Sequence, residues 1–519
     1  MSDKHHTVAI SSGLIQGTVH RGVAEFRGIP FAGPIGGTRR FRRAQPAPRW
    51  KGVHLADTWA PMVPQSSETK PPGDPGYLAF YRSLFGDNYT DNQTENGLYL
   101  NVWSAATERQ RKPVMVYLHG GAFANGSATR PRENGAALSR RENIVVVAPS
   151  HRLGIMGYLD VRELDPSADA NVGMTDIILA LRWIQENIEA FGGDRGNVTL
   201  FGESGGSLKI QTLLVMPEAK GLFHKAICQS GAWPLGALND FRSPSESQRK
   251  TREILGSLVI KDPQALAEVP ITDIVSASGD DIMSFGPVLD PATLPTSVLP
   301  AISAGWASEI PLLIGTNAHE YRFLGRPLGL PQDVDSLVDL LDSYGGPKLV
   351  EHYLETRLGL NFRLLAEDVL TDAIFRIPSI RFASRKAAAG TAPVFMYLFD
   401  WQNERRPDIG ASHGIETPFV LLNTDAVEVT RTALNAAATA KFVSAAWAAF
   451  ARQGEPNISR LPTWRPYDSK HRSTMILGKQ ARLVDDPASS DRLAWDKWAP
   501  TLDPGGPLKP WRLPHSRFV

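Results

Sequence analysis

The stretch that decides the fold is Asn197-Val198-Thr199-Leu200-Phe201-Gly202-Glu203-Ser204-Gly205-Gly206-Ser207. A β-type apolar run leads directly into a serine with a glycine two residues to either side, and a helical pattern follows at once. A strand-to-helix turn this tight needs glycines because strand and helix pass too close for Cβ atoms. The serine hydroxyl is then exposed at the carboxyl end of a strand, beside the N–H groups that begin the helix. The stretch therefore predicts that Ser204 is a nucleophile.

The same spacing of glycine and serine occurs a second time, in Gly410-Ala411-Ser412-His413-Gly414. With 45 glycines among 519 residues, a chance match to so short a pattern is expected. Residues 404–409, before the second copy, do not have the pattern of a core strand, and no amphipathic helix opens directly after it. The context therefore favours Ser204 over Ser412 as the nucleophile.

Length and composition indicate one large catalytic domain that covers residues 1–519, because no polar low-complexity linker divides the chain. Hydrophobic residues make up 42% of the chain and charged residues 21%, which is ordinary for a globular protein with a substantial core. The formal net charge of +1 gives no electrostatic basis for binding nucleic acid or an anionic membrane. We therefore expect a small-molecule substrate and neither a nucleic-acid nor a membrane partner; the oligomeric state stays open.

The N-terminal residues 1–10 lack the apolar core of a signal peptide, and no run of about eighteen apolar residues occurs in the chain. The single cysteine, Cys228, excludes an intrachain disulfide and lies in an apolar run, where a buried structural thiol is expected. A cytoplasmic enzyme is the resulting expectation.

Strand-like and helix-like segments alternate through the middle of the chain. The expected buried strands are 99–103, 114–118, 144–148, 225–229, 310–315 and 393–399, with a helix at 176–188 before the strand that carries Ser204. This alternation predicts an α/β fold with a mostly parallel central sheet and helices on both faces. Insertions are expected at about 235–300 and 320–390. Residues 64–94 form a candidate lid or gorge wall, with simple packing of that loop onto the body as an equal alternative.

A serine hydroxyl is a poor nucleophile at neutral pH, so it needs a base and an acid that orients the base. A nucleophilic serine at a sharp strand-to-helix turn is said to lie at a nucleophile elbow. In enzymes with such an elbow, the acid and then the histidine follow the serine along the chain. Glu320 follows the strand at 310–315, and His413 lies in a glycine-bounded loop after the strand at 393–399. We predict Glu320 as the acid, with a surface carboxylate as the alternative, and His413 as the base. The histidines judged less well placed are His224, His319, His352, His471 and His515.

A third element precedes these residues, in Tyr117-Leu118-His119-Gly120-Gly121-Ala122-Phe123. A strand followed by histidine and paired glycines is typical of the loop whose backbone N–H groups face a substrate carbonyl oxygen. Gly120 and Gly121, together with the N–H of Gly205, would supply three donors to an oxyanion. We therefore predict Gly120, Gly121 and Gly205 as the oxyanion hole.

Taken together, these motifs resemble the type-B carboxylesterase and cholinesterase-like family of α/β-hydrolases over nearly the whole chain. The segments that carry the resemblance are 26–34, 95–103, 117–123, 187–207, 229–231, 315–320, 413–416 and 447–456. The resemblance implies an α/β-hydrolase fold, Ser204, Glu320 and His413 as the catalytic triad, and the same three oxyanion donors. It also implies a surrounding hydrogen-bonded network of Glu203, Ser230 and Glu416.

The chain departs from the family pattern at two informative places. Where the family often has a cysteine pair closing the first long loop, this chain has Val63 and Gly97. At the position of the choline-binding tryptophan of the cholinesterases it has Asp87, so recognition of a quaternary ammonium by cation–π contact is not expected. The pattern is more similar to the bacterial carboxylesterases of the para-nitrobenzyl-esterase kind than to the animal cholinesterases.

These observations predict a serine carboxylic-ester hydrolase that acts on a hydrophobic small-molecule ester through an acyl-enzyme. No metal or organic cofactor is implied, because no metalloprotease helix, phosphate loop or dinucleotide fingerprint occurs in the right context. Two alternatives stay open: hydrolysis of an amide or carbamate by the same triad, and a non-catalytic binding member of the family.

Overall fold

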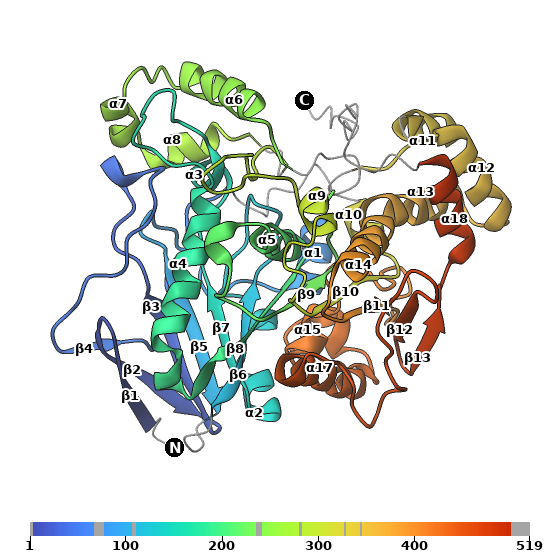
Figure 1. The fold of residues 1–519 in the computed structure, drawn as a ribbon, viewed down its shortest axis with the longest axis horizontal. Helices are drawn as coiled ribbons and strands as arrows, with labels where there is room; N and C mark the ends of the chain where they lie inside the picture. The colour runs from blue at the N-terminus through green and yellow to red at the C-terminus, as the bar shows by residue number, and fades with distance from the viewer. Residues whose placement is uncertain are drawn as a thin grey trace.

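The computed structural model describes residues 4–66, 77–105, 111–234, 241–279, 283–325, 329–342 and 345–499. Within these residues one sheet of thirteen strands crosses the molecule in the order β1-β2-β3-β5-β7-β6-β8-β9-β10-β11-β12-β13, with β4 paired to β2 (Figure 1). Its strands are β1 (Lys4–Ile10), β2 (Gly13–His20), β3 (Val23–Pro30), β4 (Val53–Leu55), β5 (Tyr99–Ala105), β6 (Lys112–Leu118), β7 (Val145–Pro149), β8 (Gly193–Glu203), β9 (Lys225–Gln229), β10 (Leu312–Asn317), β11 (Val394–Phe399), β12 (Ser473–Leu477) and β13 (Ala481–Asp485).

The seven strands from β7 to β12 in this order are parallel, and antiparallel strands flank them at both edges. Parallel strands are covered on both faces and so are apolar throughout, which is why β7 is buried at every position. The register aligns Leu118 of β6 with Gly202 of β8, and Glu203 with Gln229 of β9. The carboxyl ends of the central strands therefore meet at one edge, as predicted.

Alternate residues of the same strand enter two different cores. In β6, Val114, Val116 and Leu118 pack in one core, whereas Met115 and Tyr117 pack in the other. The first core takes in α4 (Val172–Asn187), α5 (Gly205–Leu214), α9 (Val298–Ser303) and α14 (Ile377–Ala389); the second takes in α2 (Ala136–Glu142), α15 (Thr417–Val420) and α17 (Ala436–Gln453). The prediction of a sheet with helices on both faces is confirmed.

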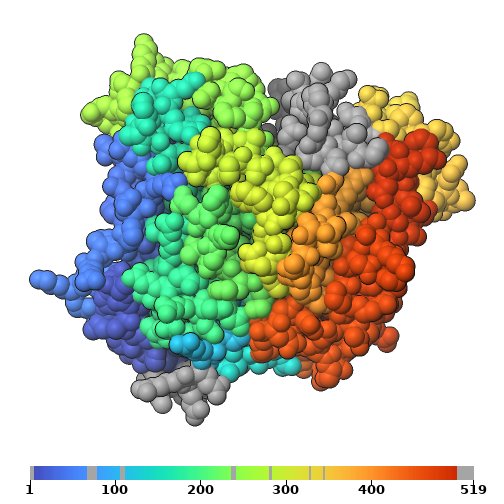
Figure 2. All heavy atoms as spheres, viewed as in Figure 1, coloured from blue at the N-terminus to red at the C-terminus, as the bar shows by residue number. Residues whose placement is uncertain are grey.

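The expected insertions at about 235–300 and 320–390 connect β9 to β10 and β10 to β11, and they are largely helical. The first contains α6 (Pro244–Ser257), α7 (Pro263–Glu268) and α8 (Ile271–Ser276); the second contains α10 (Tyr321–Leu324), α11 (Val334–Leu340), α12 (Gly346–Thr356), α13 (Phe362–Thr371) and the π-helix η6 (Asp372–Arg376). Figure 2 shows residues of α6–α8 at the upper left and residues of α11 and α12 at the upper right. Helices α11–α13 form a third core with α18 (Ser489–Trp498). Residues 235–240 lie outside the described residues, and the single-domain assignment of 1–519 stays a prediction.

The remaining regular elements are short. They are α1 (Tyr77–Phe85), α3 (Gly154–Tyr158), α16 (Glu428–Arg431), η1 (Gly37–Arg39), η2 (Pro131–Glu133), η3 (Ile188–Phe191) and η4 (Pro217–Ala219). Of the candidate lid at 64–94, residues 67–76 lie outside the described residues. In the part of the chain that the structure describes, no helix is both long and apolar enough to cross a membrane.

Candidate active site

Ser204 lies at the turn between β8 and α5 with φ +56° and ψ −120°. This left-handed φ is unfavourable for a serine, and such strain persists only where the surroundings impose it. The backbone N–H of Ser204 donates to Gln229 O on β9 (2.8 Å), and Ser204 O accepts from Leu208 N in the first turn of α5 (3.1 Å). Ser204 is partly exposed while Glu203 and Gly205 beside it are buried. The predicted elbow is therefore present.

The two residues after Ser204 must be glycines because backbone atoms of another segment approach them closely. A Cβ on Gly205 would lie 2.2 Å from Ala122 O, and one on Gly206 would lie 2.0 Å from Leu118 O. Because those neighbours are backbone atoms, they have no side-chain freedom with which to make room. Helix α5 thus packs directly on the loop that follows β6, and this contact brings the serine to the predicted oxyanion loop.

The structure brings Glu320 and His413 together, although 93 residues separate them. His413 Nδ1 lies 2.7 Å from Glu320 Oε2, and Glu320 Oε1 accepts from the backbone N–H of Asn317 at the end of β10 (2.6 Å). Glu320 is fully buried and His413 is 5% exposed. The acid therefore fixes the orientation of the imidazole ring, whose other face contacts Phe375 of η6 (ring centroids 4.9 Å apart).

The second ring nitrogen of His413 faces a carboxylate. His413 Nε2 lies 3.2 Å from Glu203 Oε1. Within the described residues Ser204 Oγ makes no hydrogen bond, so the serine hydroxyl is not hydrogen-bonded to His413 in this conformation. In enzymes without bound substrate such hydrogen bonds are often long and tighten when substrate binds.

Glu416 and Ser230 join the same buried network. Glu416 Oε1 accepts from Ser230 Oγ (3.2 Å) and Gln229 Nε2 (3.4 Å), and Glu416 Oε2 accepts from Asn317 Nδ2 (2.6 Å). Asn317 Nδ2 also donates to Ser412 O (2.8 Å), which ties the loop that carries His413 to the end of β10. Asn317 and Gln229 were not assigned a role from sequence, although both lie in the segments that carry the family resemblance.

The crowding of carboxylates controls the pKa of the base. Burial alone would lower the pKa of His413, but Glu203, Glu320 and Glu416 outweigh it and raise that pKa to about 9. Burial raises the pKa of Glu203 to about 7, against the attraction of His413. Burial and Glu320 raise the pKa of Glu416 as well. The arrangement therefore stabilises an imidazolium ion, the state that a catalytic histidine passes through.

Arg132 of η2 balances part of this negative charge. Its side chain is 2% exposed, with Nη2 4.0 Å from Glu203 Oε2 and Nη1 donating to Gly414 O (3.0 Å). The guanidinium carbon lies 4.3 Å from the ring centre of Phe85 on α1. No local sequence pattern singles out Arg132, because its partners come from distant segments.

The other histidines considered from the sequence, together with Ser412 and Cys228, have surroundings that fit a structural role. His319 Nδ1 accepts from Ala411 N (3.1 Å), and burial lowers the pKa of His319 to about 3. His352 Nε2 contacts Asp491 (2.9 Å) and His471 Nδ1 contacts Asp468 (3.0 Å), while His515 lies outside the described residues. Ser412 is fully buried, and Cys228 is buried with its pKa raised to about 12 by burial.

The predicted oxyanion loop lies against the elbow. A Cβ on Gly120 would be 2.9 Å from Glu203 Oε2 and 3.4 Å from Ser204 Cβ, and Gly121 has φ +81°. The backbone nitrogen of Ala122, which was not among the predicted donors, lies 2.5 Å from the Cβ position of Gly205, and Ala122 itself has φ +51°. Among the described residues, the N–H groups of Gly120, Gly121, Ala122 and Gly205 donate no hydrogen bond to the protein. The loop thus presents backbone donors beside the serine.

Part of the candidate lid lies next to His413, the predicted base. Phe85 of α1 packs against Phe323 of α10 in a tilted arrangement (centroids 4.8 Å apart), and the Cε1 atom of Phe85 lies 3.1 Å from the Cβ position of Gly414. At the root of this segment Val63 Cγ1 lies 3.0 Å from the Cβ position of Gly97. The two positions that replace the family's cysteine pair are thus in contact. Asp87 is an exposed residue paired with Arg82 (2.9 Å).

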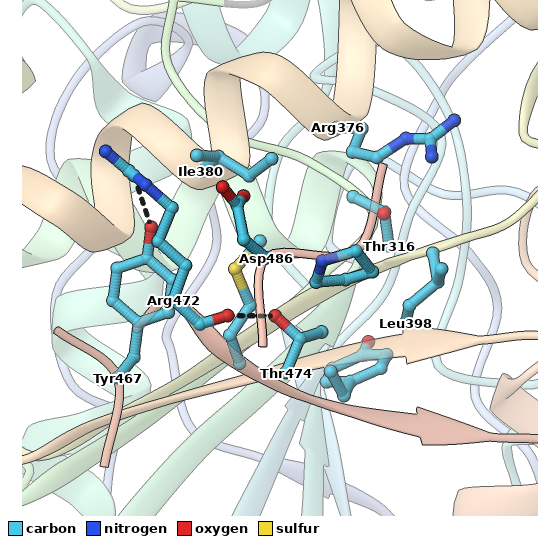
Figure 3. A pocket seen from close by; sticks show the side chains of 11 residues that line it. Thr316, Arg376, Ile380, Leu398, Tyr467, Arg472, Thr474 and Asp486 are labelled. Atoms are coloured by element: carbon cyan, nitrogen blue, oxygen red, sulfur yellow. Dashed lines mark hydrogen bonds between the residues drawn. The ribbon is translucent and has the colours of Figure 1, made fainter. Parts of the chain in front are cut away.

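Two cavities lie outside the cluster of Ser204, Glu320 and His413. One is lined by the lid residues 64–66, by Ala124 after the oxyanion loop, by 153–155 and by Phe285. The other, drawn in Figure 3, lies between α14 and the strands β10–β12, where Arg472 donates to the hydroxyl of Tyr467 (2.9 Å). Neither cavity is lined by Ser204, Glu320 or His413; the first reaches Ala124, which follows the predicted oxyanion loop.

A mostly parallel sheet with an elbow serine, a later buried acid and a histidine paired to it defines an α/β-hydrolase. The sequence matches the carboxylesterase family over residues 4–495. The chain belongs to that family and is a carboxylesterase.

Individual relatives support the same conclusion. The chain is 33% identical to the para-nitrobenzyl esterase of Bacillus subtilis (strain 168) over 515 residues, covering 94% of this chain and 98% of that protein. It is 30% identical to the phenmedipham hydrolase of Pseudarthrobacter oxydans, with the same coverage. Among solved structures, a carboxylesterase from Geobacillus stearothermophilus superposes with a TM-score of 0.82 at 32% identity, covering 94% of this chain and 99% of that one.

Proposed function

We propose that this protein hydrolyses carboxylic esters through an acyl-enzyme on Ser204, with His413 as the base and Glu320 as the orienting acid. The observation that carries the proposal is the buried 2.7 Å pair of Glu320 and His413, with His413 Nε2 3.2 Å from Glu203, the residue before Ser204. Ser204 itself is partly exposed and held at φ +56°. Such a setting supplies a nucleophile, a base and an acid that fixes the tautomer of that base.

The reaction begins when Ser204 Oγ attacks the ester carbonyl carbon and His413 Nε2 takes the hydroxyl proton. The imidazolium is stabilised by Glu320 at Nδ1. The tetrahedral intermediate collapses as His413 returns the proton to the leaving alkoxide, which departs as the alcohol and leaves an acyl group on Ser204. A water molecule then gives a proton to His413 and attacks the acyl carbon, and the second intermediate collapses as His413 returns that proton to Ser204 Oγ, which releases the carboxylic acid and restores the free serine.

The negative oxygen of each tetrahedral intermediate is bound by backbone N–H groups of the oxyanion loop and the elbow. The predicted donors are Gly120, Gly121 and Gly205, and the contact between Ala122 and Gly205 supports Ala122 as a further donor. Loss of a single donor of this kind costs on the order of 3 kcal/mol of transition-state stabilisation.

Glu203, Glu416 and Ser230 act through His413 rather than on the substrate. The two glutamates favour the imidazolium by Coulombic attraction, and Ser230 holds Glu416 by its hydroxyl (3.2 Å). The substrate is a small hydrophobic ester, because aromatic side chains border the loop that binds the carbonyl: Phe123 stacks near Trp233 (centroids 6.0 Å apart), and Phe285 lines the adjoining cavity.

The test compares the two copies of the glycine–serine motif. Ser204→Ala should lower the kcat for a soluble aryl ester by at least about 10⁴-fold, since triad members act as a unit. Ser412→Ala, which alters the buried serine of the other copy, should keep most of the activity. Equal far-ultraviolet circular dichroism of both variants shows that the fold is intact. Retained activity in Ser204→Ala would exclude the proposal.

The same triad can cleave an amide or carbamate if the leaving amine is protonated, and this alternative stays a prediction. Matched ester and carbamate substrates with the same alcohol portion separate the two activities. A larger kcat/KM for the ester supports the proposed function, whereas a larger value for the carbamate would reassign the physiological substrate class.

A further inference from the structure

Helix α5, which begins directly after the nucleophile, carries a fully buried lysine. Lys209 is 0% exposed, and every residue of α5 around it is buried. Its Nζ donates to the backbone oxygen of His119 (3.1 Å) and lies 5.6 Å from the ring centre of Phe123. The ammonium group therefore contacts both ends of the loop 119–123, the loop with the oxyanion donors.

This placement is expensive for the fold. An ammonium group loses several kcal/mol of solvation when it is buried, and methionine would fill similar space without that cost. Glu133 and Glu203 attract the charge, yet burial outweighs them and lowers the pKa of Lys209 to about 7. A buried cation at this position thus calls for a role beyond packing.

The geometry of the peptide bond relates Lys209 to the oxyanion donors. In a trans peptide the C=O and the N–H of one unit point in opposite directions. Because His119 O accepts from Lys209 Nζ, the N–H of Gly120 in the same unit faces away from the lysine. Lys209 therefore sets the direction of the first N–H group of the loop.

The next two peptide units are oriented in the same way. Burial lowers the pKa of His119 well below its usual value, so its ring is neutral and Nδ1–H donates to Gly120 O (2.9 Å). Gly121 O accepts from the backbone N–H groups of Ala124 and Asn125 (both 3.1 Å). Each of three successive carbonyls is thus held by a donor, and the N–H group of the same peptide unit, that of Gly120, Gly121 or Ala122, points away from that donor.

We propose that Lys209 is a positioning residue of the oxyanion hole: its Nζ donates to the His119 carbonyl and so holds the peptide unit that carries the first N–H donor to the substrate oxyanion. This inference rests on the proposed serine-esterase function. Preorganised donors act only on charge that develops in the transition state, so Lys209 should affect kcat rather than substrate binding. The ring of His151 stacks on the ring of His119 (centroids 4.7 Å apart) and so supports the same loop.

The experiment compares Lys209→Met with Lys386→Met in the full-length protein. Lys386, on α14, is the matched control. It is 1% exposed, and its Nζ also donates to a backbone carbonyl, that of Ser308 (3.2 Å). Each variant is assayed for kcat and KM with an aryl ester, for thermal unfolding, and for inhibition by two matched ketones. A trifluoromethyl ketone forms an alkoxide on the serine and needs the oxyanion donors, whereas the methyl ketone measures ground-state binding.

For Lys209→Met we expect kcat and trifluoromethyl-ketone affinity to fall by about 10- to 100-fold, with KM and methyl-ketone affinity within about threefold of wild type. Lys386→Met should leave all four values unchanged within twofold. Equal loss of affinity for both ketones, or unchanged kcat in folded Lys209→Met, would overturn the proposal. If Lys209→Met does not fold, Lys209→Gln is measured instead, and a selective loss for the trifluoromethyl ketone is again required. Inactive wild-type enzyme would instead refute the esterase function itself.

Discussion

Replacing Glu203 with glutamine should move the pH dependence of ester hydrolysis to lower pH. His413 acts as a base only when it is neutral, so activity is present above its pKa and is lost as the pH falls through that value. The pKa of His413 is raised from 6.5 to about 9, a difference equivalent to about 3.4 kcal/mol. Glu203, with a pKa of about 7, is ionised over the range in which His413 titrates.

The size of the effect follows from the relative contributions of the carboxylates. Three of them raise the pKa of His413 against the effect of burial; the attraction of Glu203 is the largest of the four contributions, since Glu320 acts both by hydrogen bond and by Coulombic attraction. Removing the charge of Glu203 should therefore lower the pKa by at least one quarter of the difference, roughly 0.6 pH unit or more. The midpoint of the acidic limb of kcat/KM should move down by the same amount.

The assay is kcat/KM for a soluble ester between pH 5 and about 10, with the uncatalysed rate subtracted. Glu25→Gln is the control, since Glu25 is a buried carboxylate (4% exposed) paired with Arg27 on β3, outside the site. A midpoint for Glu203→Gln within about 0.3 unit of wild type, compared with the roughly 0.6 unit expected, would refute the reasoning.

Three further predictions concern stability. Gly206→Ala places a Cβ 2.0 Å from Leu118 O. The substitution should lower the free energy of unfolding in urea by about 3 kcal/mol or more. An unchanged unfolding midpoint would contradict this and show that α5 can shift. Asp176→Asn removes the buried partner of Arg152 (2.7 Å) and should cost about 3–5 kcal/mol in the same measurement, with the pH profile of the surviving enzyme unchanged. Asn317→Leu removes the side-chain amide that donates to Ser412 O and Glu416 Oε2. It should lower the free energy of unfolding by about 2–4 kcal/mol and also lower kcat. A loss of less than about 0.5 kcal/mol would contradict the role of this network.

Most of the fold could be predicted because its signal is local. Buried parallel strands are continuous apolar runs, and 225–229 matches β9 at both ends. Boundaries were harder to predict. The helix expected from Asp176 begins at Val172, where Asn171 turns the chain in the left-handed region, and the strand expected from Ile310 begins at Leu312, after Pro311. These differences depend on backbone geometry that side-chain periodicity does not encode.

The candidate site was less completely predictable from sequence, because its support comes from contacts between distant segments. Asn317 binds Glu416 across 99 residues and Arg132 binds Gly414 across 282, so neither has a local pattern. Lys209 was overlooked for a different reason: a lysine in a helix ordinarily marks an exposed face, whereas α5 is buried on all sides. Ala122 was overlooked because the paired glycines before it carry the recognisable motif.

Peptide mapping after reaction with a fluorophosphonate tests the central claim most directly. The reagent phosphonylates a serine that a neighbouring base activates, and it needs no knowledge of the physiological ester. The account predicts one adduct, on Ser204, formed in parallel with the loss of esterase activity and absent from Ser204→Ala. An adduct on Ser412, or inactivation without any adduct on Ser204, would contradict it.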